Sequence, residues 1–240
     1  MTKKIVLVTG TTRGLGLAFS RAFSKRGYRV VGCGRSERAL NDGAEIFVRL
    51  DIGKPAEVSA LFEKVKANLG IVDVLVNNAG VLSPISPIAS LEAEALEAHM
   101  RINFFGPVYT TKALLEMRKE CVTKGVVLNV SSGAAKKGYA GWAAYCASKS
   151  ALDRFSECLA LEEKEGLMVH SIAPGIIDTD MQALIRSTKE EHFPARQKFV
   201  DLKEKDAFSS ASFVAQRFVD VAEGELTFGE VVARLENEKA

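Results

Sequence analysis

The stretch that decides the fold is residues 4–19, KIVLVTGTTRGLGLAF, where an apolar run passes into a glycine-rich turn and then a helical pattern. Residues 4–9 have the length and the Val/Ile content of a strand buried on both faces. Gly10, Gly14 and Gly16 permit a tight turn that brings backbone N–H groups, at the positive end of the following helix, close to a pyrophosphate. The unit therefore predicts dinucleotide binding, although three neighbouring glycines can also serve only as a turn. No Gly-Lys-Ser/Thr follows, which disfavours a P-loop.

The rest of the chain alternates short apolar runs with longer helical patterns. Further strands are expected at 28–33, 45–50, 72–76, 126–130 and 168–172, with a weaker seventh at 227–232. Helices are expected at 15–26, 55–69, 92–101, 104–120, 142–164 and 209–222. This alternation predicts an α/β fold, a Rossmann-type doubly wound parallel sheet of about seven strands flanked by helices, in a single domain over 1–240. Ligands are then expected beyond the carboxyl ends of the strands.

Residues 179–206 depart from this alternation, because they are rich in charge and are interrupted by Pro194. We expect one or two surface helices there. They either cap a substrate pocket or form a solvated helical insertion, and the pattern favours neither.

Composition and charge narrow the classes of function. Lys and Arg number 32 against 30 Asp and Glu, so the net charge of +2 gives no basic surface of the kind nucleic acids require. The longest apolar runs have strand length, which predicts no membrane span. The apolar run near the N-terminus ends at Gly10, so no secretory leader is expected.

The cysteine and histidine positions predict no metal site. Cys33, Cys121, Cys146 and Cys158 show no CxxC spacing, and we expect buried or half-buried free thiols in a reducing, cytoplasmic compartment. Cys146 adjoins Tyr145, but adjacent residues of a helix point about 100° apart, which disfavours a catalytic role for this thiol. The three histidines, which are scattered, are interpreted as structural or surface groups: His99, His170 and His192.

The end of the second strand bears on cofactor preference. A fold that prefers NAD usually carries an acid there for the ribose 2′-hydroxyl, but this chain has Gly34, Arg35 and Ser36. An arginine can pair with a 2′-phosphate, and Arg13 in the glycine turn could add a second positive charge. The pattern predicts NADP(H), against the alternative of two surface arginines.

A second informative stretch is WAAYCASKSALDRF, residues 142–155. Tyr145 and Lys149 are four residues apart, so they lie on one face of the expected helix. On its own this is an ordinary helical contact.

Six short motifs occur in an order and at a spacing that span nearly the whole chain: TGTTRGLG (9–16), NNAG (77–80), Asn103 in RINFFG, SS (131–132), YCASK (145–149) and PGIIDT (174–179). Each is weak singly, but together they make the chain resemble the short-chain dehydrogenase/reductase family. The resemblance implies a nicotinamide-dependent oxidoreductase.

The resemblance also implies four catalytic residues. Tyr145 would protonate the substrate oxygen, and Lys149 would hold the nicotinamide ribose and lower the tyrosine's pKa. Ser132 would donate a hydrogen bond to the carbonyl oxygen, with Ser131 the less favoured of the pair. Asn103 would help position Lys149 through water, or would only shape a bend in its helix.

The remaining matches concern the cofactor. The positions expected to bind NADP(H) are Gly10, Thr12, Arg13, Gly14, Leu15, Gly16, Arg35, Ser36, Asp51, Ile52, Asn78, Ala79, Gly80, Tyr145, Lys149, Pro174, Gly175, Ile177 and Thr179.

Two longer stretches, residues 141–163 and 173–182, resemble sepiapterin reductases and bacterial reductases of benzil-type 1,2-diketones. The aspartate that anchors the pterin in sepiapterin reductases aligns here with Val232 or Ala233, although Glu230 or Glu236 could substitute. We therefore expect an NADPH-dependent reductase of ketones or 1,2-diketones, with sepiapterin reduction as the alternative. The expected substrate pocket comprises Ser132, Ala134, Tyr139, Trp142, Met181 and Leu184, although Trp142 could instead be a core anchor.

Other functions stay open at this point. A non-catalytic NADPH-binding sensor or scaffold could use the same fold, and an NAD-dependent dehydrogenase could use the same residues in the oxidative direction. The resemblance also implies a homodimer formed by the helices at 104–120 and 142–164. A tetramer is possible, although the chain lacks the family's glycine-rich DGG tail.

Overall fold

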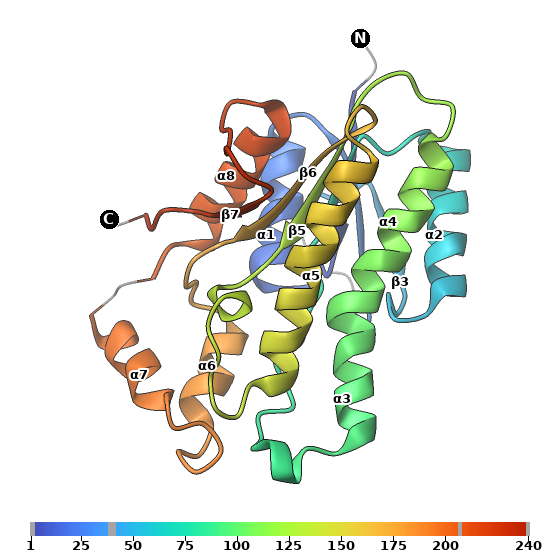
Figure 1. Ribbon diagram of the computed structural model, residues 1–240. Coiled ribbons are helices and arrows are strands. Elements are labelled where there is room, and N and C mark those ends of the chain that lie inside the picture. Colours follow the sequence, from blue (N-terminus) through green and yellow to red (C-terminus); the bar gives the residue numbers. More distant parts are fainter. Residues whose placement is uncertain (1–2, 38–41, 206–207, 239–240) are drawn as a thin grey trace.

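The computed structural model describes residues 3–37, 42–205 and 208–238. Seven parallel strands form one sheet in the order β3-β2-β1-β4-β5-β6-β7 (Figure 1). The strands are β1 (Ile5–Thr9), β2 (Arg29–Gly34), β3 (Ile46–Arg49), β4 (Val74–Asn77), β5 (Gly125–Val130), β6 (Leu167–Ala173) and β7 (Val232–Arg234). The predicted doubly wound α/β fold is confirmed.

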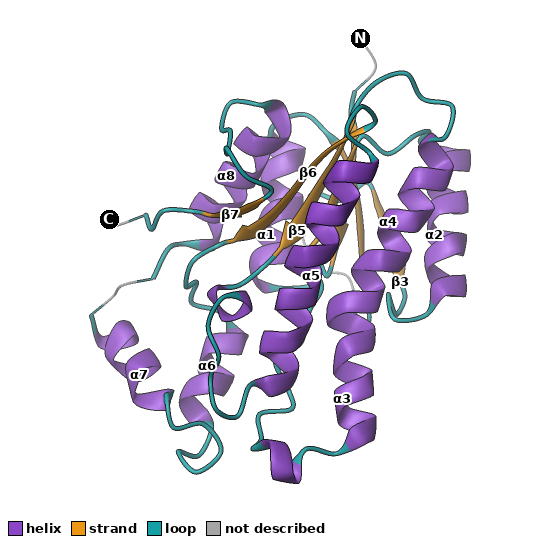
Figure 2. Ribbon diagram, viewed as in Figure 1, coloured by secondary structure: helices purple, strands orange, loops and turns teal. Residues whose placement is uncertain are grey.

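Helices cover both faces of this sheet (Figure 2). They are α1 (Gly14–Lys25), α2 (Pro55–Asn68), α3 (Ala93–Met100), α4 (Gly106–Arg118), α5 (Ala143–Glu162), α6 (Asp180–Ser187), α7 (Arg196–Glu204) and α8 (Ala211–Glu223). Two short 3-10 turns, η1 (Ile88–Ser90) and η3 (Gly133–Ala135), add to these.

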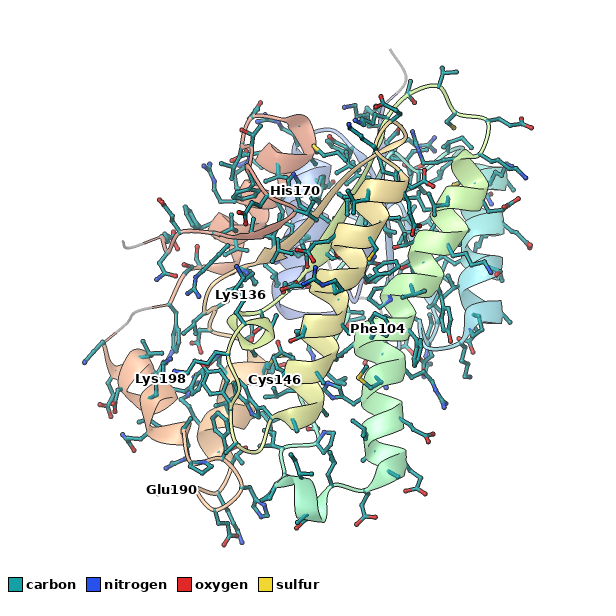
Figure 3. The ribbon with its side chains drawn as sticks, viewed as in Figure 1. Phe104, Lys136, Cys146, His170, Glu190 and Lys198 are labelled. Carbon is teal, nitrogen blue, oxygen red and sulfur yellow. The ribbon has the colours of Figure 1, made fainter. Side chains whose placement is uncertain are left out.

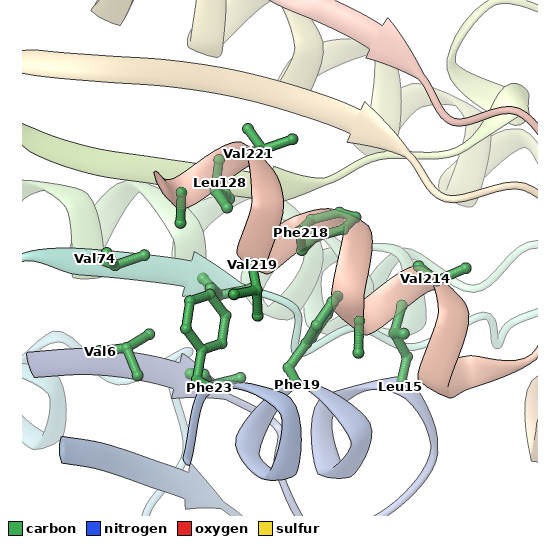
Figure 4. Packing of buried hydrophobic residues seen from close by; sticks show 14 of the residues in the cluster. Val6, Leu15, Phe19, Phe23, Val74, Leu128, Val214, Phe218, Val219 and Val221 are labelled. Atoms are coloured by element: carbon green, nitrogen blue, oxygen red, sulfur yellow. The ribbon is translucent and has the colours of Figure 1, made fainter. Parts of the chain in front are cut away.

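Side-chain alternation along the strands divides the core into two layers. In β1, Val6 and Val8 pack with α1 and α8, whereas Leu7 packs with α2, α4 and α5 on the other face. Figure 4 shows the first layer, where Phe19 of α1 meets Phe218 of α8 with ring centroids 4.7 Å apart. Each such buried apolar side chain stabilises the fold by about 1.5–3 kcal/mol.

The site is placed by the switch in strand order between β1 and β4. The chain reaches one edge of the sheet at β3 and then returns to the middle, where Val8 lies opposite Val76. Just past β4, the Asn78 side chain donates hydrogen bonds to the carbonyl oxygens of Thr9 (2.9 Å) and Gly10 (3.2 Å). These bonds tie the glycine turn after β1 to the turn after β4, at the point where open α/β sheets bind ligands.

Two predicted elements differ in the structure. The helices expected at 92–101 and 104–120 are one continuous run, because a π-helical turn (Arg101–Phe105) joins α3 to α4. The extra residue in that turn shifts the apolar period, which explains why the pattern looked broken. The seventh strand is Val232–Arg234 rather than 227–232; Phe228 instead packs on His170, with centroids 5.5 Å apart.

The charged segment forms two helices, α6 and α7, outside the two helical layers (Figure 1). Asp178 pairs with Lys203 of α7 and, at 3.4 Å, with Arg186 of α6. The Lys203 ammonium holds the pKa of that carboxyl below its usual range. The predicted surface helices are confirmed for residues 179–205, and residue 206 lies outside the described residues.

Candidate active site

A cavity of about 570 Å³ opens at the carboxyl ends of the strands. Every residue predicted for the cofactor and for the substrate pocket lines it, and so do three of the four predicted catalytic residues. The fourth, Asn103, lies behind the wall. Glu230 and Glu236, considered as substitutes for an acidic anchor, are not among the lining residues.

The glycine turn forms the floor of one end of the cavity. Gly10 has φ +73°, and a Cβ placed on it would lie 2.9 Å from Ala79 Cα. A Cβ on Gly16 would lie 2.0 Å from the Gly10 carbonyl oxygen, so neither position can carry a side chain. Helix α1 has no side-chain cap, which leaves its first N–H groups available to a ligand. These features fit a dinucleotide pyrophosphate.

The predicted 2′-phosphate site lies at the same end. Arg35 follows β2 and lines the cavity, and its guanidinium makes no ion pair within the described part of the chain. Arg13 is also at the cavity, but its side chain pairs with Asp180 at 3.1 Å. Arg35 is therefore the better-placed cation for a phosphate, and Arg13 would have to leave or share its partner.

The predicted catalytic residues meet between the two ends of the cavity. Burial raises the pKa of Tyr145, and a hydrogen bond with Ser132 opposes that rise. Lys149 is buried, and its Nζ donates to the Val130 carbonyl oxygen at 2.7 Å. Burial lowers the pKa of Lys149 to about 8, partly opposed by Asp153.

One prediction about this group is wrong for the cofactor-free chain. Lys149 was expected to lower the pKa of Tyr145, yet the tyrosine's pKa is raised, chiefly by burial. The ammonium lies 5.8 Å from the centre of the Tyr145 ring and is directed at a backbone carbonyl. A phenol shielded from water and without a closer cation favours its neutral, proton-donating form.

The structure distinguishes the two serines. Ser131 donates its hydroxyl proton to Asp153 Oδ1 at 2.5 Å, and Ser171 donates to the same oxygen at 2.6 Å. Ser132 Oγ accepts a 3.2 Å hydrogen bond from the Ala134 N–H, and its hydroxyl is directed at Tyr145, whose pKa it lowers. The geometry therefore supports the predicted preference for Ser132.

Asn103 is occupied by structural contacts. Its amide exchanges two hydrogen bonds of 2.8 Å with the backbone N–H and carbonyl of Val81. It also contacts His99 Nε2 at 2.8 Å. These bonds fix the loop after β4 to the π-helical turn, as the helix-bend interpretation expected.

Aromatic side chains form the other end of the cavity. Trp142 stacks on Phe193, with centroids 4.4 Å apart and planes 11° apart, and it contacts Phe199 at 5.5 Å. Tyr139 lies 5.1 Å from the Trp142 ring. Trp142 is 4% exposed and also lines the cavity, so both interpretations of it hold.

The turn before α5 also approaches the backbone of the charged segment. A Cβ on Gly141, which has φ +85°, would lie 2.0 Å from the His192 carbonyl oxygen. Helices α6 and α7 contribute seven lining residues to the cavity: Asp180, Met181, Gln182, Leu184, Ile185, Lys198 and Phe199.

Sequence reasoning missed several residues of this end, among them Phe193, Lys198, Phe199 and Arg234. Two phenylalanines within an otherwise charged segment were a usable signal for a buried contact. Arg234 offered no such signal in the sequence, because the pairing of β7 with β6 brings it to the cavity from far along the chain.

The other singled-out residues have structural positions. His99 is buried and bonded to the Ser83 carbonyl at 2.8 Å, as a structural histidine is expected to be. All four cysteines are free thiols, although Cys158 is exposed rather than buried or half-buried. The described residues hold no group of three or more potential metal ligands and no helix long and apolar enough to cross a membrane.

Comparison with known proteins agrees with this geometry. The profile of the family described as short chain dehydrogenase matches residues 4–190. A benzil reductase ((S)-benzoin forming) of Bacillus cereus is 33% identical over 95% of this chain and 98% of its own. An NADPH-dependent pterin aldehyde reductase of Arabidopsis thaliana is 31% identical over 74% and 76%, respectively. The crystal structure of the KRED1-Pglu enzyme superposes with a TM-score of 0.88 at 32% identity, covering 97% of this chain and 100% of that one. The chain belongs to the short chain dehydrogenase family.

Proposed function

We propose that this oxidoreductase uses NADPH to reduce a ketone or a 1,2-diketone to an alcohol. The observation that carries the proposal is a single cavity that joins the glycine turn to Ser132, Tyr145 and Lys149. A dinucleotide bound on the turn would lead towards these three side chains, which lie between the turn and the aromatic end.

The chain's own residues would then serve the carbonyl oxygen. A bound nicotinamide supplies the hydride for the carbonyl carbon. Ser132 would donate a hydrogen bond to the oxygen as negative charge develops there. Tyr145, kept neutral by burial, would transfer its hydroxyl proton to that oxygen and complete the alcohol.

Lys149 has a position suited to support this step. A cofactor ribose placed beside it would give the ammonium a second hydrogen-bond acceptor besides the Val130 carbonyl. In its cationic form it would stabilise the phenolate that remains after proton transfer. The residue therefore acts on the cofactor and on the proton donor together.

The preference for NADPH rests on Arg35. Its position after β2, without a carboxylate partner among the described residues, suits a 2′-phosphate. An oxidative, NAD-dependent role would leave this cation without a ligand.

The aromatic end of the cavity supports a substrate with an aryl group beside its carbonyl. Tyr139, Trp142 and Phe199 provide ring faces and edges for such a group. The similarity to a benzil reductase points the same way. The pterin alternative has less support, because neither Glu230 nor Glu236 reaches the cavity.

The test is a comparison of NADPH consumption with benzil, 1-phenyl-1,2-propanedione and sepiapterin, repeated with NADH. We expect the diketones to be reduced with NADPH and sepiapterin to be a poor substrate. A strong preference for sepiapterin would reverse the substrate ranking, and no consumption with any carbonyl would contradict the proposed reaction.

We also propose that the chain forms a homodimer through α4 and α5. Aromatic residues of the π-helical turn gather beside these helices. Phe104 (Figure 3) packs on Phe155 of α5, and Phe105, which is 43% exposed, stacks on Tyr109 of α4. Light scattering at micromolar concentration should give twice the 26.0 kDa chain mass. A monomer under these conditions would contradict this assembly.

A further inference from the structure

Two cations at the substrate end of the cavity are used neither by the catalytic residues nor by the proposed 2′-phosphate site. Arg234 is the last residue of β7, paired in register with Ala173, so it lies at the carboxyl edge where the site is built. Its guanidinium approaches η3, since a Cβ on Gly133 would lie 3.4 Å from Arg234 Nη1. Gly133 directly follows Ser132, which places Arg234 beside the proposed carbonyl site.

The second cation comes from the charged segment. Lys198 of α7 (Figure 3) lines the same cavity, and its Nζ lies 5.8 Å from the centre of the Tyr139 ring. It lies 5.9 Å from the Phe199 ring, so the ammonium is held along the aromatic wall. Two cations from different elements therefore border the aromatic end.

Neither cation is neutralised by the chain. Within residues 3–37, 42–205 and 208–238, no carboxylate pairs with Arg234 or with Lys198. Two carboxylates line the cavity, and both are engaged elsewhere: Asp51 accepts from the Gly53 N–H, and Asp180 pairs with Arg13. The substrate end thus carries uncompensated positive charge over an aromatic surface.

We propose that the substrate is an aromatic 2-oxo acid, a vicinal dicarbonyl whose second carbonyl belongs to a carboxylate, and that Arg234 is the specificity-determining residue that binds this carboxylate. The inference rests on the proposed carbonyl reduction and narrows its substrate class. A guanidinium can bind a carboxylate through two parallel hydrogen bonds, which fixes the orientation of the adjacent ketone. Lys198 adds a second attraction for the anion, and the aryl group lies against Tyr139 and Trp142.

The reaction balances without any further reactant. The hydride adds to the ketone carbon as NADPH becomes NADP+, and the C=O double bond becomes a single bond. The proton of the Tyr145 hydroxyl passes to the oxygen and is replaced from solvent. The carboxylate is unchanged, so the product is a 2-hydroxy acid.

The test uses benzoylformate and its methyl ester, which have the same ketone and aryl group but differ in charge. We expect the wild-type chain to have the higher kcat/KM with the acid. Arg234→Gln should lower the acid-to-ester ratio of kcat/KM by about tenfold, the size expected for one charge-assisted hydrogen bond. The loss should appear in the KM for the acid rather than in kcat. Lys198→Gln should lower the ratio by a smaller factor, and it provides a second variant if Arg234→Gln folds poorly.

The matched control is Lys136→Gln, which removes one positive charge beside η3 from an exposed residue that does not line the cavity. It should leave the acid-to-ester ratio unchanged. If the ester is reduced and neither Arg234→Gln nor Lys198→Gln alters the acid-to-ester ratio of kcat/KM, this inference is overturned while the proposed carbonyl reduction stands. A raised KM for NADPH in Arg234→Gln, with the ratio intact, would also overturn it by assigning the cation to the cofactor. Failure to reduce any carbonyl compound would overturn the proposed function as well.

Discussion

The two ends of the cavity are built in different ways. The cofactor end is made of backbone, where Gly10 and Gly16 leave no room for side chains next to Ala79 and the first turn of α1. The substrate end is made of side chains, where Trp142 meets Phe193 of the loop between α6 and α7 and Phe199 of α7. A backbone site depends on short local motifs, whereas a side-chain site depends on distant segments that pack together. We therefore expect cofactor binding at the backbone-built end to persist when side chains of the substrate end are changed.

Tyr145 lies where the two ends meet, and its removal should give the largest effect. Tyr145→Phe deletes the hydroxyl that we propose as the proton donor and keeps the ring. Turnover of diketones should fall by about 10²- to 10⁴-fold, the usual contribution of a positioned acid. NADPH affinity, measured by quenching of protein fluorescence, should change little. Tyr28→Phe, at a buried tyrosine that does not line the cavity, is the matched control, and near wild-type turnover by Tyr145→Phe would refute the mechanism.

The different construction of the main core and of the substrate end predicts different effects when a buried phenylalanine in each is replaced by alanine. Both Phe218, in the core between α1 and α8, and Phe193, beside the cavity, are 0% exposed. Phe218→Ala should lower the free energy of unfolding by about 3–5 kcal/mol, because it leaves a cavity in the main core. Phe193→Ala should loosen α6 and α7 locally, so that the diketone KM rises more than the NADPH KM.

Urea unfolding and steady-state kinetics on the same two variants check this. An equal rise in both KM values for Phe193→Ala would show that the two ends of the cavity are coupled. That result would contradict the proposal that cofactor binding is independent of the substrate end.

The sequence predicted most residues of the cofactor end and fewer of the substrate end, because local motifs build the first and distant segments build the second. Gly10, Arg35 and Asn78 follow strands within a few residues, so alternation of elements was enough to bring them together. Arg234 reaches the cavity through β7 pairing, and Phe193 packs behind Trp142; no local pattern encodes either contact. The π-helical turn at Arg101–Phe105 was also missed, because the Asn103 side chain within it bonds to Val81, a contact that no local pattern reports. The tyrosine's raised pKa depends on burial, which a four-residue spacing does not report.

Burial of Lys149 predicts a pH dependence of stability for the cofactor-free chain. Its pKa is about 8 when folded, against 10.5 for an exposed lysine. Between these values the unfolded chain binds more protons than the folded chain, so the free energy of unfolding should rise with pH. The rise should approach about 3 kcal/mol across that window.

Lys149→Met removes this titration and serves as the reference. Urea unfolding at pH 7.5, 8.5 and 9.5 should show the wild-type chain gaining stability relative to the variant. A constant difference between the two would show that Lys149 is not desolvated as described.

The smallest expected effect concerns the 2′-phosphate. Arg35→Ala should raise the KM for NADPH by about tenfold while leaving the KM for NADH nearly unchanged, since NADH lacks the phosphate. Arg13→Ala should have a weaker effect, because its guanidinium already pairs with Asp180. An unaltered NADPH-to-NADH ratio in Arg35→Ala would move the phosphate site elsewhere at the cofactor end.

The central claim is that hydride passes from the nicotinamide to a carbonyl carbon in this cavity. NADPH carrying deuterium at both C4 positions can be incubated with the wild-type chain and benzil, and the acid-quenched product analysed by mass spectrometry. The account predicts benzoin with one deuterium on its carbinol carbon, formed in a one-to-one ratio with NADP+. Product without deuterium, or NADPH consumption without an alcohol product, would contradict it.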